Sequence, residues 1–265
     1  MKTVILIPAR YASSRYPGKP LVELKGSTGV TKPLIQRSVE AARRVSGVSE
    51  VYVTTDDERI AKACNRFGVG VIMTSPECRN GTERCAEALS SLHEPDLIVN
   101  FQGDALLTPP GFVESLIARM QSDSDALVAT PAIRLRSEET RALQAEEAAG
   151  RVGGTSVVTD GQGYALYFSK RLIPYLPKPA LDGAISPVRL HVGVYAYRPE
   201  ALDRYVATPV SELEQLEGLE QLRFLVTGVP MAVVDVETPP FALRELNNPE
   251  DVEPIEQALI DSGLE

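Results

Sequence analysis

The sequence predicts an α/β protein built on a doubly wound, mostly parallel sheet. In the first half of the chain, short apolar runs typical of buried strands alternate with stretches of helical periodicity. Such alternation is typical of parallel strands joined by helices on both faces of one sheet. Polar residues follow several of the apolar runs, and ligands of such sheets bind beyond the carboxyl ends of the strands. The 265 residues are enough for one α/β domain with an ordinary core.

Each element of the first half follows from its local pattern. Residues 3–7 (TVILI) are apolar throughout and stop at Pro8, as expected for a strand buried on both faces. The helical segments instead repeat apolar residues every three or four positions. The predicted strands are 3–7, 50–55, 69–74 and 96–101, and the predicted helices are 33–45, 57–67, 81–92 and 110–120.

The second half changes character and predicts a small antiparallel insertion at about residues 155–200. Strand-like segments there flank a glycine-containing turn at 160–163, and the prolines within 174–187 predict a loop. No repeat or low-complexity tract divides the sequence, so we expect a single domain over residues 1–265. The predicted strands are 126–134, 155–159, 165–168, 190–197 and 231–236, and the predicted helices are 138–149, 212–225 and 249–261.

Composition excludes several classes of protein. The net charge of −9 argues against a nucleic-acid-binding surface, which needs a basic face. No apolar run approaches the ~20 residues of a membrane span, and the amino terminus does not read as a signal peptide. Cys64, Cys78 and Cys85 form no C-x-x-C pair, which favours reduced thiols and a cytoplasmic protein. His93 and His191 are too few for a histidine metal cluster.

A cluster of cations follows the first predicted strand, in the segment IPARYASSRYPGKP (residues 7–20). Arg10, Arg15 and Lys19 lie there among serines and a glycine. A loop after a buried strand can present backbone N–H groups and cations to phosphates, and arginine suits bidentate phosphate contacts. The spacing is neither that of a P-loop nor G-x-G-x-x-G. The residues alone leave two interpretations, a phosphate-binding loop and an ordinary solvated loop.

Other polar residues also allow two interpretations. Asp104 follows the strand at 96–101, where a carboxylate is placed to bind Mg²⁺ or to form a turn. In NGTER (residues 80–84), Asn80 or Thr82 is placed to cap the following helix. Asp56 and Asp57 follow the second strand and fit helix caps better than a site.

Taken together, the segments resemble one known family. IPARYASSRYPGKPL resembles the signature of the sugar-acid cytidylyltransferases, and within that family the CMP-Kdo synthetases (3-deoxy-manno-octulosonate cytidylyltransferases). The resemblance implies a nucleotidyltransferase-like variant of the Rossmann fold and a homodimer. It also implies Mg²⁺-dependent transfer of CMP from CTP to an acidic acceptor, with release of pyrophosphate. Further segments resemble family blocks in family order: VYVTTDDERIA, NGTERCAEAL, IVNFQGDAL, GYALYFSKRLIP, RLHVGVYAYR, LEQLEGLEQLRFL and NNPEDVE.

The resemblance also implies roles for individual residues. Taken alone, His191 in an apolar strand reads as a core histidine, but its match to a family block favours contact with the acceptor. The implied catalytic residues are Arg10, Arg15, Lys19 and Asp104, and the implied metal ligands are Asp104 and Asn247. The implied nucleotide-binding residues are Pro8, Ala9, Arg10, Ser13, Ser14, Lys19, Asn80, Gly81, Thr82, Arg84 and Gln102. The implied acceptor-binding residues are Gln102, Lys170, Arg189, His191, Tyr195, Glu220 and Gln221.

The sequence departs from the family pattern at four places. Ala105 and Leu106 replace the Glu-Pro of the usual Q-G-D-E-P block, and Asn247 replaces the first Asp of D-T-P-E-D. The segment at 155–158 lacks the usual lysine, and Lys170 stands in place of an arginine. The nucleotide loop stays close to the family form. We therefore expect CTP to be retained, and the acceptor or the metal coordination to differ.

These departures leave the acceptor open. A Kdo-like 3-deoxy sugar acid is the first expectation, and a small phosphonate acid such as phosphonoformate is the alternative, because its extra negative charge could replace a missing carboxylate at Mg²⁺. Transfer of UMP, or of CMP to a phospho-alcohol, is a weaker rival. A non-catalytic nucleotide-binding protein is a further alternative, which the loss of acidic residues at Ala105 and Asn247 motivates.

Overall fold

The computed structural model describes residues 1–13, 15–241 and 243–264. The chain forms two compact units, the first comprising Met1–Glu114 with Pro239–Glu265 and the second comprising Ser115–Thr238. Helix α4 (Pro110–Ser122) contains the first boundary between them. The expected organisation, one domain with an insertion at about 155–200, stays a prediction.

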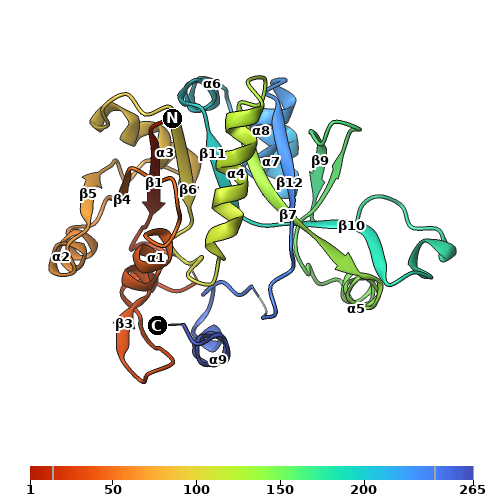
Figure 1. The fold of residues 1–265 in the computed structure, drawn as a ribbon, viewed down its shortest axis with the longest axis horizontal. Coiled ribbons are helices and arrows are strands. Elements are labelled where there is room, and N and C mark those ends of the chain that lie inside the picture. The colour runs from red at the N-terminus through yellow and green to blue at the C-terminus, as the bar shows by residue number, and fades with distance from the viewer. Residues whose placement is uncertain (14, 242, 265) are drawn as a thin grey trace. The chain divides into compact units, whose positions relative to one another are not determined.

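The first unit contains a parallel sheet with the strand order β5, β4, β1, β6 (Figure 1). β1 is an inner strand, because Val4 pairs with Glu50 of β4 on one side and with Ile98 of β6 on the other. The elements of this sheet and its connections are β1 (Thr3–Pro8), α1 (Leu34–Ala42), β4 (Glu50–Thr55), α2 (Glu58–Arg66), β5 (Gly70–Met73), α3 (Gly81–Ala88), a 3₁₀ turn η2 (Leu89–Ser91) and β6 (Leu97–Phe101).

The order of these strands makes the sheet doubly wound. The chain steps from β1 to β4 and β5, and then returns past β1 to β6. Right-handed crossovers therefore place α1 and α2 on one face of the sheet and α3 on the other. The direction of winding reverses between β1 and β6, and ligands of open α/β sheets bind in the crevice at that point. The loops after β1 and β6, which carry the predicted cationic cluster and Asp104, both start there. The predicted fold class is confirmed.

Local chemistry explains these elements. All five residues of β6 are buried, as is expected for a strand covered on both faces. The Asp57 carboxylate accepts a hydrogen bond of 2.8 Å from the Arg59 backbone N–H and caps α2, as expected. Asn80, and not Thr82, caps α3 by accepting a bond of 2.8 Å from the Glu83 backbone N–H.

A hydrophobic cluster in the first unit joins the carboxy-terminal helix to a short hairpin. The hairpin and the 3₁₀ turn before it were not predicted, because their strands are too short for a periodic signal. Leu24, Leu34, Leu107, Leu246 and Leu259 are all buried in this cluster. The elements are η1 (Lys19–Leu21), β2 (Glu23–Lys25), β3 (Thr31–Pro33), η4 (Pro249–Asp251) and α9 (Val252–Ser262).

The second unit is organised around the long strand β7 (Val128–Arg136). β12 pairs with β7 in parallel, whereas β11 and β10 pair with it antiparallel, and β8 and β9 continue from β10 in antiparallel fashion. The remaining bounds are α5 (Ser137–Ala148), β8 (Ser156–Thr159), β9 (Ala165–Ser169), η3 (Lys178–Leu181), β10 (Ile185–His191), β11 (Val194–Tyr197), α6 (Pro199–Ala207), α7 (Glu212–Glu217), α8 (Leu222–Val226) and β12 (Met231–Val236).

Three sequence predictions in the second unit are wrong. The expected strand at 190–197 is two strands, because the extended conformation is interrupted between β10 and β11. Each of these two strands pairs with β7. The expected helix at 212–225 is also divided, because Gly218 ends α7 in the left-handed conformation with φ of 60°. The expected loop ends early, since β10 begins at Ile185. Helix α6 was not predicted.

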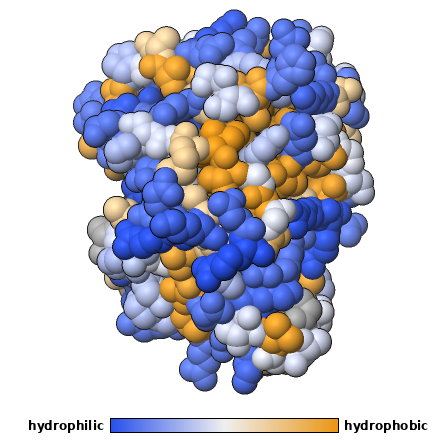
Figure 2. Space-filling view, turned by 90° about the vertical axis from the view of Figure 1, so that its left-hand side faces the viewer, coloured by the Kyte–Doolittle hydropathy of each residue, from blue (hydrophilic) through white to orange (hydrophobic). Residues whose placement is uncertain are grey.

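The surface and the cysteines fit an ordinary folded protein. Figure 2 shows mainly hydrophilic side chains with smaller hydrophobic patches between them, and scattered apolar side chains such as those of Val30 and Met73 are normal on protein surfaces. Within the described ranges, no helix combines the length and the apolar character needed to cross a membrane. Cys64, Cys78 and Cys85 are free, and burial raises the pKa of the Cys64 thiol to about 12.

Candidate active site

Lys19 and Asp104 meet at the point where the winding of the sheet reverses. Lys19 Nζ donates a hydrogen bond of 2.5 Å to Asp104 Oδ2, and the two side chains are 18% and 16% exposed. Lys19 comes from the loop after β1, and Asp104 from the loop after β6. The structure therefore brings together two of the predicted catalytic residues across 85 positions of sequence.

Gly103 makes this approach possible. A Cβ atom at this position would lie 2.7 Å from the backbone oxygen of Pro8, a distance that real contacts do not show. The Ser38 hydroxyl donates a bond of 2.8 Å to the Gly103 oxygen and holds the loop from α1. The absence of a side chain at Gly103 thus lets the segment before Asp104 lie against the end of β1.

A second pair of side chains joins the first loop to the carboxy-terminal segment. Arg15 donates a bond of 2.9 Å to the side-chain oxygen of Asn247. The Asn247 amide in turn donates to Glu245 over 3.4 Å, while its backbone N–H donates to Asp251 over 2.9 Å. The predicted metal ligand Asn247 therefore lies beside a carboxylate, Glu245, that the sequence analysis did not identify.

The other predicted residues of the first loop lie near β1 with varied exposure. Arg10 is exposed, Ala9 is buried, and the Ser13 hydroxyl accepts a bond of 3.3 Å from the Tyr16 backbone N–H. Ser14 lies outside the described residues.

The start of α3 approaches the end of β6 closely. A Cβ atom at Gly81 would lie 3.1 Å from Asn100 Nδ2 and 3.3 Å from Gln102 Nε2. Thr82 and Arg84 are buried, and Arg84 pairs with Asp56 at 3.2 Å. Asp56 thus stabilises the conformation of Arg84, and the predicted nucleotide contacts at Gly81 and Gln102 lie beside the amide of Asn100.

Asn100 is a candidate that the sequence analysis missed. It is fully buried in β6, and its Nδ2 atom has no hydrogen-bond partner among the residues that the structure describes. A buried amide without a partner is costly, and a ligand that accepts a hydrogen bond would remove that cost. A polar residue inside the apolar run DLIVNF was the available signal.

In the second unit, an aspartate joins two arginines. Arg189 donates to Asp235 over 2.6 and 3.2 Å, and Arg134 donates to the same carboxylate over 3.1 Å. Burial tends to raise the pKa of Asp235, but the two guanidinium groups outweigh it and the pKa is lowered. The cluster keeps one excess positive charge, which suits an acidic ligand. Arg134 and Asp235 were not predicted.

His191, which follows Arg189 by two residues in the sequence, is held in its neutral state. Its Nε2 lies 2.9 Å from the Thr130 hydroxyl, and its ring packs edge-on against Phe168 at 5.1 Å. Loss of hydration lowers the pKa of His191 to about 3. His191 is therefore an uncharged hydrogen-bonding group near neutral pH.

We expect this neutral state to make stability depend on pH. An unfolded histidine has a pKa near 6.5, so between pH 6.5 and 5 the unfolded chain binds more protons than the folded one, and stability falls as the pH falls. From pH 7.5 to 5.5, the wild type should lose about 1 kcal/mol more of its unfolding free energy than His191→Gln. Urea unfolding at the two pH values measures this. His93→Gln, at an exposed histidine, should keep the wild-type pH dependence. Equal losses in wild type and His191→Gln would contradict the shift.

The remaining predicted acceptor residues differ in accessibility. Tyr195 is buried and stacks on Tyr197 at 5.8 Å. Glu220 is half-buried, and Gln221 is buried with its Nε2 lacking a partner within the described ranges. Lys170 is exposed, with its backbone N–H donating to a carboxylate of α7. Their roles as acceptor contacts stay predictions.

Two departures from the family pattern have a packing explanation. Leu106 is buried in the hydrophobic cluster of the first unit, and Ala105 is buried just before it. Ser156 is buried in β8, and its hydroxyl donates a bond of 2.5 Å to the Arg171 backbone oxygen. The side chains of Ala105, Leu106 and Ser156 therefore contribute to packing or hydrogen bonding within the fold.

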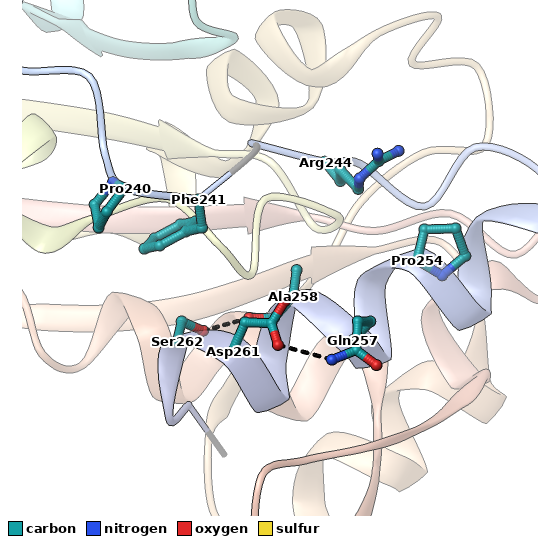
Figure 3. Close-up of a pocket in the computed structure, with 8 residues that line it drawn as sticks. All are labelled: Pro240, Phe241, Arg244, Pro254, Gln257, Ala258, Asp261 and Ser262. Atoms are coloured by element: carbon teal, nitrogen blue, oxygen red, sulfur yellow. Dashed lines mark hydrogen bonds between the residues drawn. The ribbon is translucent and has the colours of Figure 1, made fainter.

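A pocket of about 640 Å³ lies between α9 and the segment before it (Figure 3). None of the side chains predicted to bind nucleotide, acceptor or metal lines it. Hydrogen bonds within α9 join Gln257 to Asp261 and Ser262 to Ala258. The lining residues are Pro240, Phe241, Arg244, Pro254, Gln257, Ala258, Asp261 and Ser262.

Comparison with known proteins matches this arrangement to a family. Residues 4–234 match a family model described as cytidylyltransferase. The chain belongs to the cytidylyltransferase family. A cytidylyltransferase is a nucleotidyltransferase, so the protein is an enzyme that uses CTP, and the predicted family is confirmed.

Individual cytidylyltransferases are similar over the full length. The chain is 39% identical to the 3-deoxy-manno-octulosonate cytidylyltransferase of Maricaulis maris, over 99% of both chains. It is also 39% identical to the mitochondrial enzyme of the same name from Arabidopsis thaliana, over 99% of this chain and 85% of that protein. A solved structure of CMP:2-keto-3-deoxy-manno-octonic acid synthetase complexed with CTP is 37% identical, covers 100% of both chains and has a TM-score of 0.84.

Proposed function

We propose that this cytidylyltransferase transfers CMP from CTP to Kdo or a closely related 3-deoxy sugar acid. The similarity to a 3-deoxy-manno-octulosonate cytidylyltransferase over 99% of both chains carries this proposal. In the reaction, an acceptor hydroxyl oxygen forms a bond to the α-phosphorus of CTP, and its proton passes to solvent. The bond from the α-phosphorus to the bridging oxygen of the β-phosphate breaks, and pyrophosphate leaves with the electron pair.

Cations of the first loop suit the triphosphate. Transfer of a phosphoryl-type group depends mainly on positioning and on neutralising charge on the leaving group. Arg10 and Arg15 are exposed, and Lys19 lies at the crevice between β1 and β6. We assign Lys19 and Arg15 to the pyrophosphate, where their charge counts most.

The donor atoms beside these cations fit Mg²⁺, which we include in the proposal. Asp104 and Asn247 offer oxygen atoms, the ligands that Mg²⁺ prefers, and cationic side chains contact both of them. Across residues 1–13, 15–241 and 243–264, no three His, Cys, Asp or Glu side chains converge as a metal-binding group. Mg²⁺ usually needs only one or two carboxylates besides substrate phosphates and water. When bound, the ion would neutralise charge on the phosphates.

The second unit suits an acidic acceptor. Arg189 is the natural contact for a carboxylate, which would compete with Asp235 for its guanidinium group. His191, which is neutral, would orient the acceptor by hydrogen bonding without adding charge. We further propose a homodimer, on the family resemblance alone, and a cytoplasmic location, on the pattern of the cysteines.

A small phosphonate acid is a second candidate acceptor, favoured by the uncharged Asn247 at a position where the family has a carboxylate. Pyrophosphate release from CTP and Mg²⁺ should be measured with Kdo, other 2-keto-3-deoxy sugar acids, sialic acid, phosphonoformate and simple phosphonates. Release with Kdo, identified as CMP-Kdo by mass spectrometry, is the expected result. Release with a phosphonate alone would overturn the sugar-acid proposal, and release without added metal would overturn the Mg²⁺ proposal.

A further inference from the structure

Glu245 and Asn247 are presented together by the segment that precedes α9. Leu246 between them is fully buried in the hydrophobic cluster with Ile255 and Leu259, so this point of the segment is anchored. Glu245 is exposed and Asn247 is half-buried, and their side chains contact each other over 3.4 Å. The buried leucine therefore fixes two oxygen-bearing side chains next to each other.

Cationic side chains already contact the side-chain oxygens of Asn247 and Asp104. Arg15 contacts the Asn247 oxygen at 2.9 Å, and Lys19 contacts Asp104 at 2.5 Å. Both cations belong to the loop that we assign to the triphosphate. Phosphate groups would attract them, and the oxygens of Asp104 and Asn247 would then need another cation.

Packing brings the segment of Glu245 to the same part of the first unit as Asp104. Leu106, two residues after Asp104, is buried in the hydrophobic cluster that also contains Leu246. The cations that contact Asp104 and Asn247, Lys19 and Arg15, belong to one loop. A divalent cation bound between these oxygen-bearing segments would relieve the repulsion between their carboxylates.

We infer that Glu245 supplies the second carboxylate of the Mg²⁺ site, in place of the charge that is absent at Asn247, with Asp104 as the first carboxylate. The inference rests on the proposed Mg²⁺ dependence. It explains how the site keeps two acidic groups although the family position itself carries an amide. An exposed carboxylate is also accessible to a hydrated ion, and Mg²⁺ keeps several of its waters in most protein sites.

The test uses Mn²⁺, which shares the preference of Mg²⁺ for oxygen ligands and gives an electron paramagnetic resonance signal. The full chain is titrated with Mn²⁺, alone and with CTP but no acceptor. We expect Glu245→Gln to raise the Kd for Mn²⁺ at least tenfold, since even indirect partners of a metal are worth 10–100-fold in affinity. Adding Asn247→Asp to this variant should recover most of the loss, because it returns one carboxylate to the site.

Two controls separate the role of Glu245 from other effects. Glu253→Gln removes the same charge from an exposed position in the first turn of α9 and should leave the Mn²⁺ affinity unchanged. CTP affinity without metal reports whether the nucleotide loop of Glu245→Gln is intact, and we expect it to be retained or slightly increased. Equal Mn²⁺ affinity in Glu245→Gln and Glu253→Gln would overturn the inference alone. Absence of Mn²⁺ binding by the wild type, with and without CTP, would overturn the Mg²⁺ proposal and this inference with it.

Discussion

Lys19→Ala should reduce kcat/KM for CTP by about a hundredfold to a thousandfold, the usual cost of removing one group that stabilises transition-state charge. Lys19 lies at the crevice between β1 and β6 and is the cation that contacts Asp104. Its loss removes positive charge from the leaving pyrophosphate. We expect the effect in kcat as well as in KM, because that charge develops during the reaction. Steady-state pyrophosphate release with varied CTP measures both.

The matched control is Lys62→Ala, which removes a lysine from an exposed position in α2. It should change kcat/KM by less than about twofold, since the charge of an exposed side chain is screened by water and salt. The unfolding free energy should fall by no more than about 1–3 kcal/mol in Lys19→Ala, because the pair with Asp104 is largely buried and its loss leaves one carboxylate without this partner. A large loss of stability, or an unchanged kcat/KM, would show that Lys19 acts through the fold and not on the reaction.

Gly103→Ala should lower the free energy of unfolding by about 2–3 kcal/mol, as overpacking of a closely packed site does. The added Cβ would lie 2.7 Å from the Pro8 backbone oxygen. This oxygen belongs to the backbone, so no flexible side chain can move aside to relieve the contact. Relief of this contact must move the segment that carries Gln102 and Asp104 away from the end of β1. Activity should therefore fall as well. Urea unfolding and pyrophosphate release report the two effects.

Gly111→Ala is the comparison for this variant. Nothing lies within 4 Å of a Cβ built at Gly111, and the residue sits in the first turn of α4. Alanine favours a helix over glycine by up to about 1 kcal/mol, so this variant should be unchanged or slightly stabilised. Equal stability of the two variants would mean that the close approach at Gly103 is not needed.

The sequence alone was enough to place the strands that build the first unit and the loops that follow them. Residues 4–7 and 97–99 are apolar without interruption, as is expected for strands covered on both faces, and β1 and β6 contain them. The alternation of strands and helices then implied a doubly wound sheet. The cationic loop and Asp104 followed as candidates because each comes directly after such a strand.

Prediction failed where a helix or strand is interrupted without a strong local signal in the sequence. Gly218 divides α7 from α8, yet a glycine inside a helical pattern is often tolerated. The separation of β10 from β11 depends on the different partners that they find along β7, which periodicity does not report. The β2–β3 hairpin is stabilised by packing against α9, from the other end of the chain.

Sequence by itself therefore determined the fold class, the family and the position of the cationic loop after the first strand, because each of these depends on the order of residues along the chain and not on which distant segments meet. Only the tertiary structure decided that Lys19 meets Asp104, that Arg15 meets Asn247, and that Asn100 keeps a buried amide without a partner in the described chain. These contacts join residues whose positions are set by the winding of the sheet and by the packing of Leu246. No local pattern encodes such long-range proximity.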